Sequence, residues 1–339
     1  MAGRLLLTKV TPAHQTRSRE MRYEFSLIAH KPKIPLQPIY MTIRTNSTPR
    51  PSLPTSFRSL VGCACAAVFS LLLVACNPAG SEEKMRVSVS IAPLRYAVES
   101  LLDTNVVINV LTPDGASPET YQLTPKQVAE LSESQLYVRV GSLGFENTQM
   151  RKVTQNMAHL LCVNSACGIS PLKHSHGDEM ESEDPHVWMS PINMKVIAHN
   201  VLLTLESIDT VHEVTYAKRF HLFVQRMDSI DNAIRQKLRN IKSRAFLIYH
   251  PALGYYAKNY GLRQLSVQND GKEPSADYLA HLIQECRREK VRVVFIQKEY
   301  SGKTARLVAE EIGARVVEIN PLSEDWELEI TRITDALCE

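Results

Sequence analysis

The 339-residue sequence lacks several patterns that would point to a common class of protein. It has no Cys-x-x-Cys pair, which argues against a cysteine zinc site and against a thioredoxin-type motif. It has no His-Glu-x-x-His, so it offers no helix of the zinc-hydrolase type. Basic residues form no stripe, and no internal repeat recurs at a short fixed period. These absences disfavour nucleic-acid binding and a repeat architecture.

The net charge of +3 is unevenly distributed along the chain. Residues 1–75 contain ten Lys and Arg against two Glu, which gives this segment a charge of +8. The rest contains 29 Lys and Arg against 34 Asp and Glu, so the body of the protein carries a charge of −5. A mildly acidic body with scattered charges again disfavours nucleic acid as a partner.

The apolar run at 61–75 has 15 residues, too few to span a bilayer but the usual length of a signal-peptide core. Three arginines lie between Met41 and this run, which ends in Leu-Val-Ala followed by Cys76. This ending resembles the bacterial lipoprotein signal, in which the Cys is lipidated and becomes the mature N-terminus. An ordinary signal-anchor helix with a chance Cys is the alternative. We therefore predict a non-native extension at 1–40, a true start at Met41, a signal peptide at 41–75, lipidation of Cys76 and a tether at 76–84.

Four cysteines lie beyond the leader, in a chain that is expected to be exported to an oxidising compartment where disulfides are permitted. Cys162 and Cys167 are close enough in sequence to bridge across a turn. Cys286 and Cys338 would tie the last segment to a preceding helix. Their pairing is left open by the sequence.

Beyond the leader, segments of strand and helix pattern alternate. The predicted strands are 86–91, 106–111, 136–140, 245–249, 291–296 and 316–319, and the predicted helices are 97–102, 124–132, 193–207, 276–290 and 305–311. Between the two halves, apolar residues recur at intervals of three and four over 211–241, which predicts a helix of about 30 residues. We predict an α/β fold of two similar lobes, at 85–210 and 243–339, joined by one long rigid helix at 211–242.

Residues 183–191 read Glu-Asp-Pro-His-Val-Trp-Met-Ser-Pro and form the most informative stretch of the chain. Pro191 suits the first turn of a helix, because proline lacks only an N–H that has no partner there. His186 is thereby held between two prolines at a helix entrance, which suits a metal ligand that must arrive already oriented. Trp188 is expected to pack. A surface or hydrogen-bonded histidine is the alternative for His186.

A polar run precedes this stretch and carries His174, His176 and several carboxylates up to Glu183. Two imidazoles and several carboxylates on one loop predict an accessory tract that collects metal ions weakly. A solvated acidic loop is the alternative.

Three predicted strands lead into segments that carry candidate ligands. The strand at 106–111 leads to Glu119, the strand at 245–249 to His250, and the strand at 316–319 to Asn320. In α/β folds small ligands bind beyond the carboxyl ends of the strands. Together with His186, these residues would lie where two lobes close on one ion. Glu299 also follows a strand and would be able to reach the cleft, but it is interpreted as a surface carboxylate.

Five motifs in order carry a resemblance to a known family: 115–118 (Gly-Ala-Ser-Pro), 184–188 (Asp-Pro-His-Val-Trp), 249–252 (Tyr-His-Pro-Ala), 271–274 (Gly-Lys-Glu-Pro) and 320–322 (Asn-Pro-Leu). Over about residues 85–339 the chain resembles the metal-binding substrate-capture lipoproteins of ABC transporters, most of all the zinc-uptake (ZnuA-type) branch. The resemblance implies a monomeric, exported lipoprotein that is membrane-anchored, faces the periplasm or cell exterior, and serves an ABC permease and its ATPase. His174 and His176 fall where zinc members carry a His-rich loop.

The resemblance also implies a ligand set, with two departures. Glu119 stands where the family usually has His, and Asn320 stands where it usually has Asp. The implied set is Glu119, His186 and His250, with Asn320 as a candidate fourth ligand. Water or a nearby carboxylate, Asp325 or Glu327, would otherwise complete a tetrahedron.

Zinc is the metal that this set favours, because manganese members usually carry Glu where His250 stands. The additional oxygen ligand keeps manganese and iron open. A zinc-dependent hydrolase is an alternative, because two His and one Glu with an open position also form a catalytic ligand set. The sequence supplies no general base beside the metal, so we expect no enzyme. An adhesin of the same fold with a structural metal site is the remaining alternative.

Overall fold

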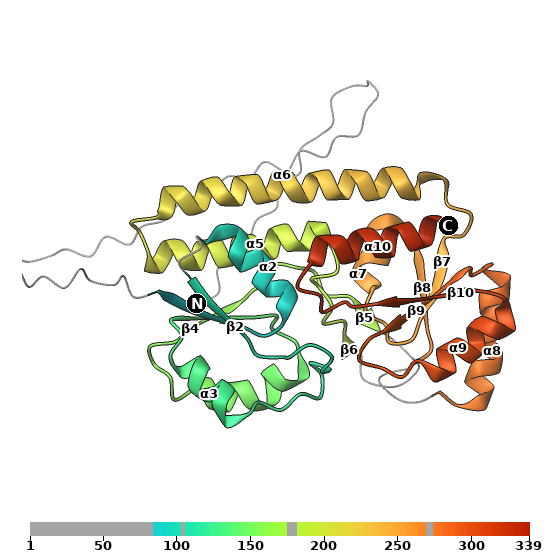
Figure 1. The fold of residues 1–339 in the computed structure, drawn as a ribbon, viewed down its shortest axis with the longest axis horizontal. Coiled ribbons are helices and arrows are strands. Elements are labelled where there is room, and N and C mark those ends of the chain that lie inside the picture. Colours follow the sequence, from blue (N-terminus) through green and yellow to red (C-terminus); the bar gives the residue numbers. More distant parts are fainter. Residues whose placement is uncertain (1–83, 103–105, 175–181, 269–273) are drawn as a thin grey trace, which may run out of the picture. The chain divides into compact units, whose positions relative to one another are not determined.

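The computed structural model describes residues 84–102, 106–174, 182–268 and 274–339, which form two α/β lobes (Figure 1). The predicted fold class is therefore confirmed. Cys76 and the leader before it, His176, and the residues 271–273 of one motif lie outside the described residues. The lipidation of Cys76 and the metal-collecting role of His176 stay predictions.

The N-terminal lobe is built on a four-stranded parallel sheet in the order β2-β1-β3-β4. In the centre, Val87 of β1 lies opposite Ile108 of β2 on one side and Leu136 of β3 on the other. The elements of this lobe are β1 (Met85–Val89), α2 (Ala92–Leu101), β2 (Val106–Val110), α3 (Pro125–Ser132), β3 (Leu136–Arg139), the π-helical turn η1 (Glu146–Met150), α4 (Arg151–Thr154), β4 (Leu161–Asn164), the hairpin strands β5 (Lys173–His174) and β6 (Ser182–Glu183), and α5 (Pro191–Ile208).

The C-terminal lobe repeats this plan. Its four parallel strands lie in the order β10-β9-β7-β8, which is the strand order of the first lobe read from the opposite edge. The similarity of the lobes thus extends to their topology. The lobes are connected by α6 (Glu213–Lys237) and the 3₁₀ turn η2 (Leu238–Asn240), and the elements of the second lobe are β7 (Ala245–Ile248), α7 (Gly254–Tyr260), β8 (Arg263–Ser266), α8 (Ala276–Arg288), β9 (Val293–Gln297), α9 (Lys303–Ile312), β10 (Arg315–Ile319) and α10 (Trp326–Cys338).

Helix α6 runs along both lobes (Figure 1) and packs against α2 and α5 of the first lobe and α10 of the second. It buries Tyr216, Phe223, Met227 and Ile234, which belong to the apolar stripe in the sequence. A helix that contacts both lobes along its length restrains their relative motion. The predicted long connecting helix is confirmed, although the α-helix ends at Lys237 and continues only as a 3₁₀ turn.

Helix α5 begins where the sequence predicts. Ser190 accepts a hydrogen bond from the N–H of Asn193, and Pro191 occupies the first turn, where its missing N–H costs nothing. This cap stops the helix from extending back into residues 184–189. The segment that carries His186 is therefore an irregular loop whose end is fixed by a helix.

One hydrophobic core cluster extends through both lobes, and a second lies beneath α8 and α9 of the C-terminal lobe. The shared cluster contains Trp188 and Trp326, both fully buried. The indole N–H of Trp188 donates to the carbonyl of Pro321 at 2.8 Å, and the indole N–H of Trp326 donates to the carbonyl of Trp188 at 2.9 Å. These two reciprocal bonds fasten the site-bearing loops of the two lobes to each other, and each satisfies a buried donor.

The four cysteines of the described chain are free thiols, so neither expected bridge is present. Cys286 points from α8 into the second core cluster, where burial raises its pKa to about 12. Cys338 lies exposed at the end of α10. Cys286 and Cys338 do not form a disulfide, because a side chain on the buried face of α8 cannot reach the surface at the end of α10.

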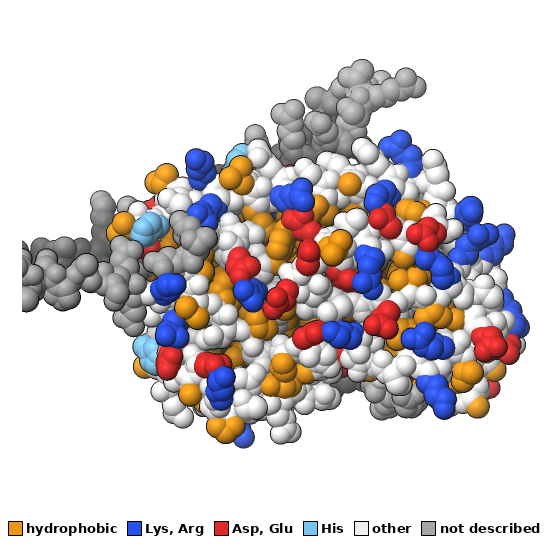
Figure 2. Space-filling view, viewed as in Figure 1, with side chains coloured by type: hydrophobic (Ala, Val, Ile, Leu, Met, Phe, Trp, Pro, Cys, Tyr) orange, Lys and Arg blue, Asp and Glu red, His pale blue; other side chains and the backbone are white. Residues whose placement is uncertain are grey.

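Acidic and basic side chains alternate over the visible face of the molecule, across α6 and α10 (Figure 2). Several form pairs between elements, such as Lys195 with Asp228 at 2.6 Å. No helix in the described part of the chain is both long and apolar enough to cross a membrane.

Candidate metal centre

His186 lies on the loop between β6 and α5 and is buried, with 6% of its surface exposed. Its Nδ1 lies 2.8 Å from Oδ1 of Asp184, and the same oxygen accepts the backbone N–H of His186 at 2.9 Å. Because the carboxylate accepts the Nδ1 proton, the ring presents the lone pair of Nε2 on its opposite side. The Asp-Pro-His turn therefore fixes both the position and the tautomer of this imidazole.

His250 follows β7 in the second lobe and is also buried, with 7% of its surface exposed. Its Nδ1 lies 2.9 Å from Oε1 of Gln268, which again leaves Nε2 facing the cleft. Both ends of the Gln297 amide bond to the backbone of His250, since Oε1 accepts its N–H at 3.2 Å and Nε2 donates to its carbonyl. The Tyr300 ring stacks on the imidazole with centroids 5.2 Å apart.

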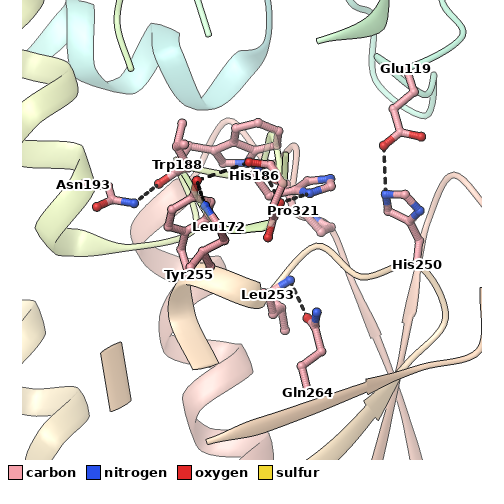
Figure 3. Close-up of polar contacts among 12 residues, drawn as sticks. Glu119, Leu172, His186, Trp188, Asn193, His250, Leu253, Tyr255, Gln264 and Pro321 are labelled. Atoms are coloured by element: carbon pink, nitrogen blue, oxygen red, sulfur yellow. Dashed lines mark hydrogen bonds and ion pairs between the residues drawn. The ribbon is translucent and has the colours of Figure 1, made fainter. Parts of the chain in front are cut away.

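Glu119 lies on the loop after β2 and points toward His250 (Figure 3). Its Oε1 is 3.2 Å from Nε2 of His250, and about one third of its side chain is exposed. The backbone carbonyl of Glu119 packs directly against Cα of Gly144, so closely that a Cβ at residue 144 would overlap it. A glycine is thus required there if the Glu119 loop is to keep this position.

The ligand atoms of Glu119, His186 and His250 all lie within 4.8 Å of one another. Two of these side chains come from the N-terminal lobe and one from the C-terminal lobe. They line one small pocket between the lobes, which is bounded by Ser117, Pro118, Glu119, His186, Trp188, His250, Ala252, Gln297, Glu299, Tyr300, Pro321 and Leu322. The structure therefore brings together the three residues that the sequence nominates, close enough to hold a single ion.

Electrostatics inside the pocket favour a bound cation. Burial opposes ionisation of Glu119, but its hydrogen bond to His250 and the charges of both imidazoles outweigh it and lower its pKa. Burial would lower the pKa of His250, but the hydrogen bond and charge of Glu119 raise it instead. In the metal-free protein the site thus attracts a proton at Nε2 of His250, in the place where a metal ion would lie.

Asn320, the candidate fourth ligand, is engaged elsewhere. Its Oδ1 accepts the N–H of Leu322 at 3.0 Å, and its Nδ2 lies 3.5 Å from Oδ1 of Asp114. It lines a separate, neighbouring pocket with Asp114 and Glu324. The structure does not bring this side chain to the three-residue group, because its amide is used by its own turn and by the opposite lobe.

The two alternative carboxylates are also committed to other partners. Asp325 caps α10 by accepting the N–H of Leu328 at 3.1 Å. Glu327 is bound by the guanidinium of Arg226 and by the hydroxyl of Tyr96, at 2.5 Å in the latter case. These contacts fasten α10 to α6 and α2, so neither carboxylate serves the pocket.

Glu299, interpreted from the sequence as a surface carboxylate, lines the pocket instead. That interpretation was wrong. Burial raises the pKa of Glu299, and a hydrogen bond from its own backbone N–H and the charge of the neighbouring His250 oppose this. The signal that would have identified it is its position just beyond the carboxyl end of β9, next to the strand that carries His250.

Gly254 carries the first of our predictions. It begins α7 in the second lobe, and a Cβ on it would overlap Oδ2 of Asp184, which is buried in the first lobe and orients His186. Gly254→Ala should therefore displace Asp184 and weaken metal binding on the order of 10- to 100-fold, the usual cost of losing an orienting partner. Competition with a chromophoric chelator measures this. Lys258→Ala, an exposed change on the same helix, is the control, and equal affinity of the two variants would contradict the prediction.

Comparison with known proteins agrees with this fold. The family described as zinc-uptake complex component A, periplasmic (ZnuA), matches residues 87–331. The chain is 25% identical over 288 residues to the high-affinity zinc uptake system protein ZnuA of Bacillus subtilis, covering 78% of this chain and 89% of that protein. It is also 25% identical over 243 residues to the iron-binding protein YfeA of Yersinia pestis, covering 70% and 78%.

Solved structures give the same result. A crystal structure of ZnuA matches with a TM-score of 0.71 and 31% identity, covering 75% of this chain and 98% of that one. A zinc-bound ZnuA deletion mutant matches with a TM-score of 0.70 and 32% identity, covering 75% and 96%.

Two parallel-sheet lobes with a histidine–carboxylate group between them define, together with these relatives, an extracytoplasmic solute-binding protein for metal ions rather than an enzyme. The chain belongs to the ZnuA family, whose match spans most of its length.

Proposed function

We propose that this protein captures zinc in the cleft between its lobes and delivers it to the permease and ATPase of an ABC importer. The proposed ligands are Glu119, His186 and His250. The observation that carries the proposal is the orientation of the two imidazoles, since each has its Nδ1 bonded to an oxygen and its Nε2 directed at the cleft. Neutral imidazole nitrogens with one carboxylate form a set that suits zinc.

The positions of the three ligands also suit reversible binding of an ion. His250 lies just beyond the end of a strand and His186 lies at a capped helix entrance, so these two side chains lose little conformational entropy when the ion binds. The negative charge of Glu119 offsets part of the charge of the ion. Binding releases the proton that the Glu119–His250 pair attracts, which makes capture dependent on pH.

Metal analysis of protein purified without chelator, followed by competition between zinc and manganese, tests the proposal. We expect one tightly bound zinc per chain and displacement of manganese by zinc. A preparation that retains manganese or iron against equimolar zinc would contradict zinc as the cargo. The carboxylate ligand and the iron-binding relative favour manganese or iron as the second candidate. Rescue of growth under zinc chelation separates uptake from an adhesin with a structural metal.

The Glu119 position provides a second prediction. Changing Glu119 to His restores the residue that the family usually carries and exchanges an oxygen ligand for a nitrogen. Because imidazole protonates between about pH 7 and 5 whereas a carboxylate stays ionised, the zinc affinity of the variant should fall more steeply over this range, by about one additional proton per ion. It should also discriminate better against manganese.

The matched control for this change is Glu119→Ala, which removes the ligand without replacing it. Its zinc affinity should lie below that of the parent at pH 7, and its pH dependence should not steepen. Zinc affinity and zinc-to-manganese preference that are the same in the parent and in Glu119→Ala would mean that water, not Glu119, fills this position.

A further inference from the structure

The three-residue group leaves one position of a zinc ion without a protein ligand, since zinc in proteins is commonly four-coordinate. The pocket contains a second carboxylate, Glu299, in addition to Glu119. The sequence offers three candidates for the fourth position, Asn320, Asp325 and Glu327. Each of them makes hydrogen bonds to other parts of the protein. Glu299 is thus the remaining anionic group of the pocket.

The other polar side chains beside Glu299 are already used. Gln297 is bonded at both ends of its amide to the backbone of His250. The Tyr300 hydroxyl bonds to Ser117, and its ring stacks on His250. The carboxylate of Glu299, in contrast, accepts a hydrogen bond from its own backbone N–H, and its side chain makes no hydrogen bond or ion pair with another of the described residues. A half-buried carboxylate whose single hydrogen bond is to its own backbone is costly to keep ionised, and a cation in the pocket would reduce that cost.

The backbone on both sides of Glu299 is held in place. On one side, Nζ of Lys298 lies 2.5 Å from Oδ2 of Asp114 in the opposite lobe. On the other side, the N–H of Tyr300 bonds to the carbonyl of Gln297 at 3.1 Å, and its ring rests on the His250 imidazole. The short turn after β9 is thus fixed between a contact with the first lobe and a contact with a proposed ligand. The Glu299 side chain starts from a constrained position at the pocket wall.

We propose that Glu299 is the fourth protein ligand of the captured ion and takes the place that Asn320 does not fill. This inference rests on the proposed function, because it concerns the same site. The carboxylate lies outside the group of atoms within 4.8 Å of one another, so its side chain must rotate toward the ion on binding. Two carboxylates would then balance the charge of a divalent ion, with two imidazoles completing a set of two nitrogens and two oxygens.

The test compares three single variants by zinc competition with a chelator and by the visible absorption of the cobalt-substituted protein, which reports ligand type and number. Glu299→Gln keeps the shape and removes the charge, and its zinc affinity should fall on the order of 100-fold, the contribution of one ligand, with a changed cobalt spectrum. Glu324→Gln removes an exposed carboxylate of the neighbouring pocket and should resemble the parent in both measurements. Asn320→Ala should also keep the parent cobalt spectrum.

A parent-like affinity and spectrum for Glu299→Gln would overturn the inference, and so would a spectral change confined to Asn320→Ala. If Glu299→Gln folds poorly, Glu299→Asp retains the charge with a shorter reach and should give an intermediate affinity. Other results would refute the proposed function, zinc capture in the cleft, and they differ from those that refute the role of Glu299. If the parent protein binds no zinc, or binds it equally well without the two imidazoles, the proposed zinc capture is refuted. If only Glu299→Gln behaves like the parent, the role of Glu299 is refuted and the proposed capture stands.

Discussion

Replacing His186 and His250 together by alanine should abolish tight zinc binding. Structural zinc sites bind with about 10–16 kcal/mol over some four ligands, so each ligand contributes roughly 3 kcal/mol. Loss of two should weaken binding by at least about 10⁴-fold, since each 1.4 kcal/mol is a factor of about ten. Chelator competition and calorimetry measure the change. The effect should be larger than that of any other substitution considered, because both rings are buried with Nε2 directed at the cleft.

The matched control is the double variant His221→Ala and His281→Ala. Both of these imidazoles are exposed on helices, and each has a neighbour one turn away on its own helix, Gln225 and Asp277. They lie outside the pocket, so zinc affinity should equal that of the parent. If the His186/His250 variant retained parent-like affinity, the cleft would not be the binding site.

The second large effect should come from Trp188→Ala, this time on stability. The Trp188 side chain is fully buried in the core that both lobes share and donates to Pro321 across the lobe boundary. Removing such a side chain leaves a cavity, and the free energy of unfolding should fall by about 3–5 kcal/mol. Urea denaturation of the metal-free protein measures this without the stabilisation that a bound ion adds.

Trp188→Phe separates the contribution of apolar packing from that of the hydrogen bond to Pro321. It keeps most of the apolar volume and leaves the carbonyl of Pro321 without its donor, so about 1–3 kcal/mol should be lost. Leu203→Ala, at a half-exposed position on α5, should cost well under 1 kcal/mol. A loss for Trp188→Ala no larger than that for Leu203→Ala would show that the indole does not hold the lobes together.

Local sequence patterns predict most of the fold because its strands and helices are strongly periodic. The buried strands, such as the one centred on Val87, and the apolar stripe of α6 were located correctly. Helices α7 and α10 were not predicted, and two strands escaped prediction because their patterns are weaker. β4 is a four-residue strand that is largely exposed at the edge of its sheet, and β8 reads Arg-Gln-Leu-Ser with one buried residue. Their strand conformation comes from pairing with β3 and β7 rather than from composition.

The site residues also fall into two groups, those that local sequence predicts and those that it does not. His186 and His250 follow from chain geometry, since a proline-bounded turn and a strand end each fix one side-chain direction within a few residues. Asn320 and Glu299 depend on contacts far away in sequence. Asp114, which lies on a loop of the other lobe, bonds to Lys298 next to Glu299 and approaches the amide of Asn320. No local pattern contains that information, so the sequence could not distinguish which of the two side chains lines the pocket.

The core that runs through both lobes makes them mutually dependent. Each lobe has its own sheet, yet Phe246 and Ile330 of the second half pack in the same cluster as Leu94 and Met194 of the first. A fragment ending near the middle of α6 would present its half of this cluster to water as a broad apolar surface, of the kind that drives aggregation. The two sheets thus repeat in topology only, and we expect neither half of the chain to fold as an independent domain when it is produced alone.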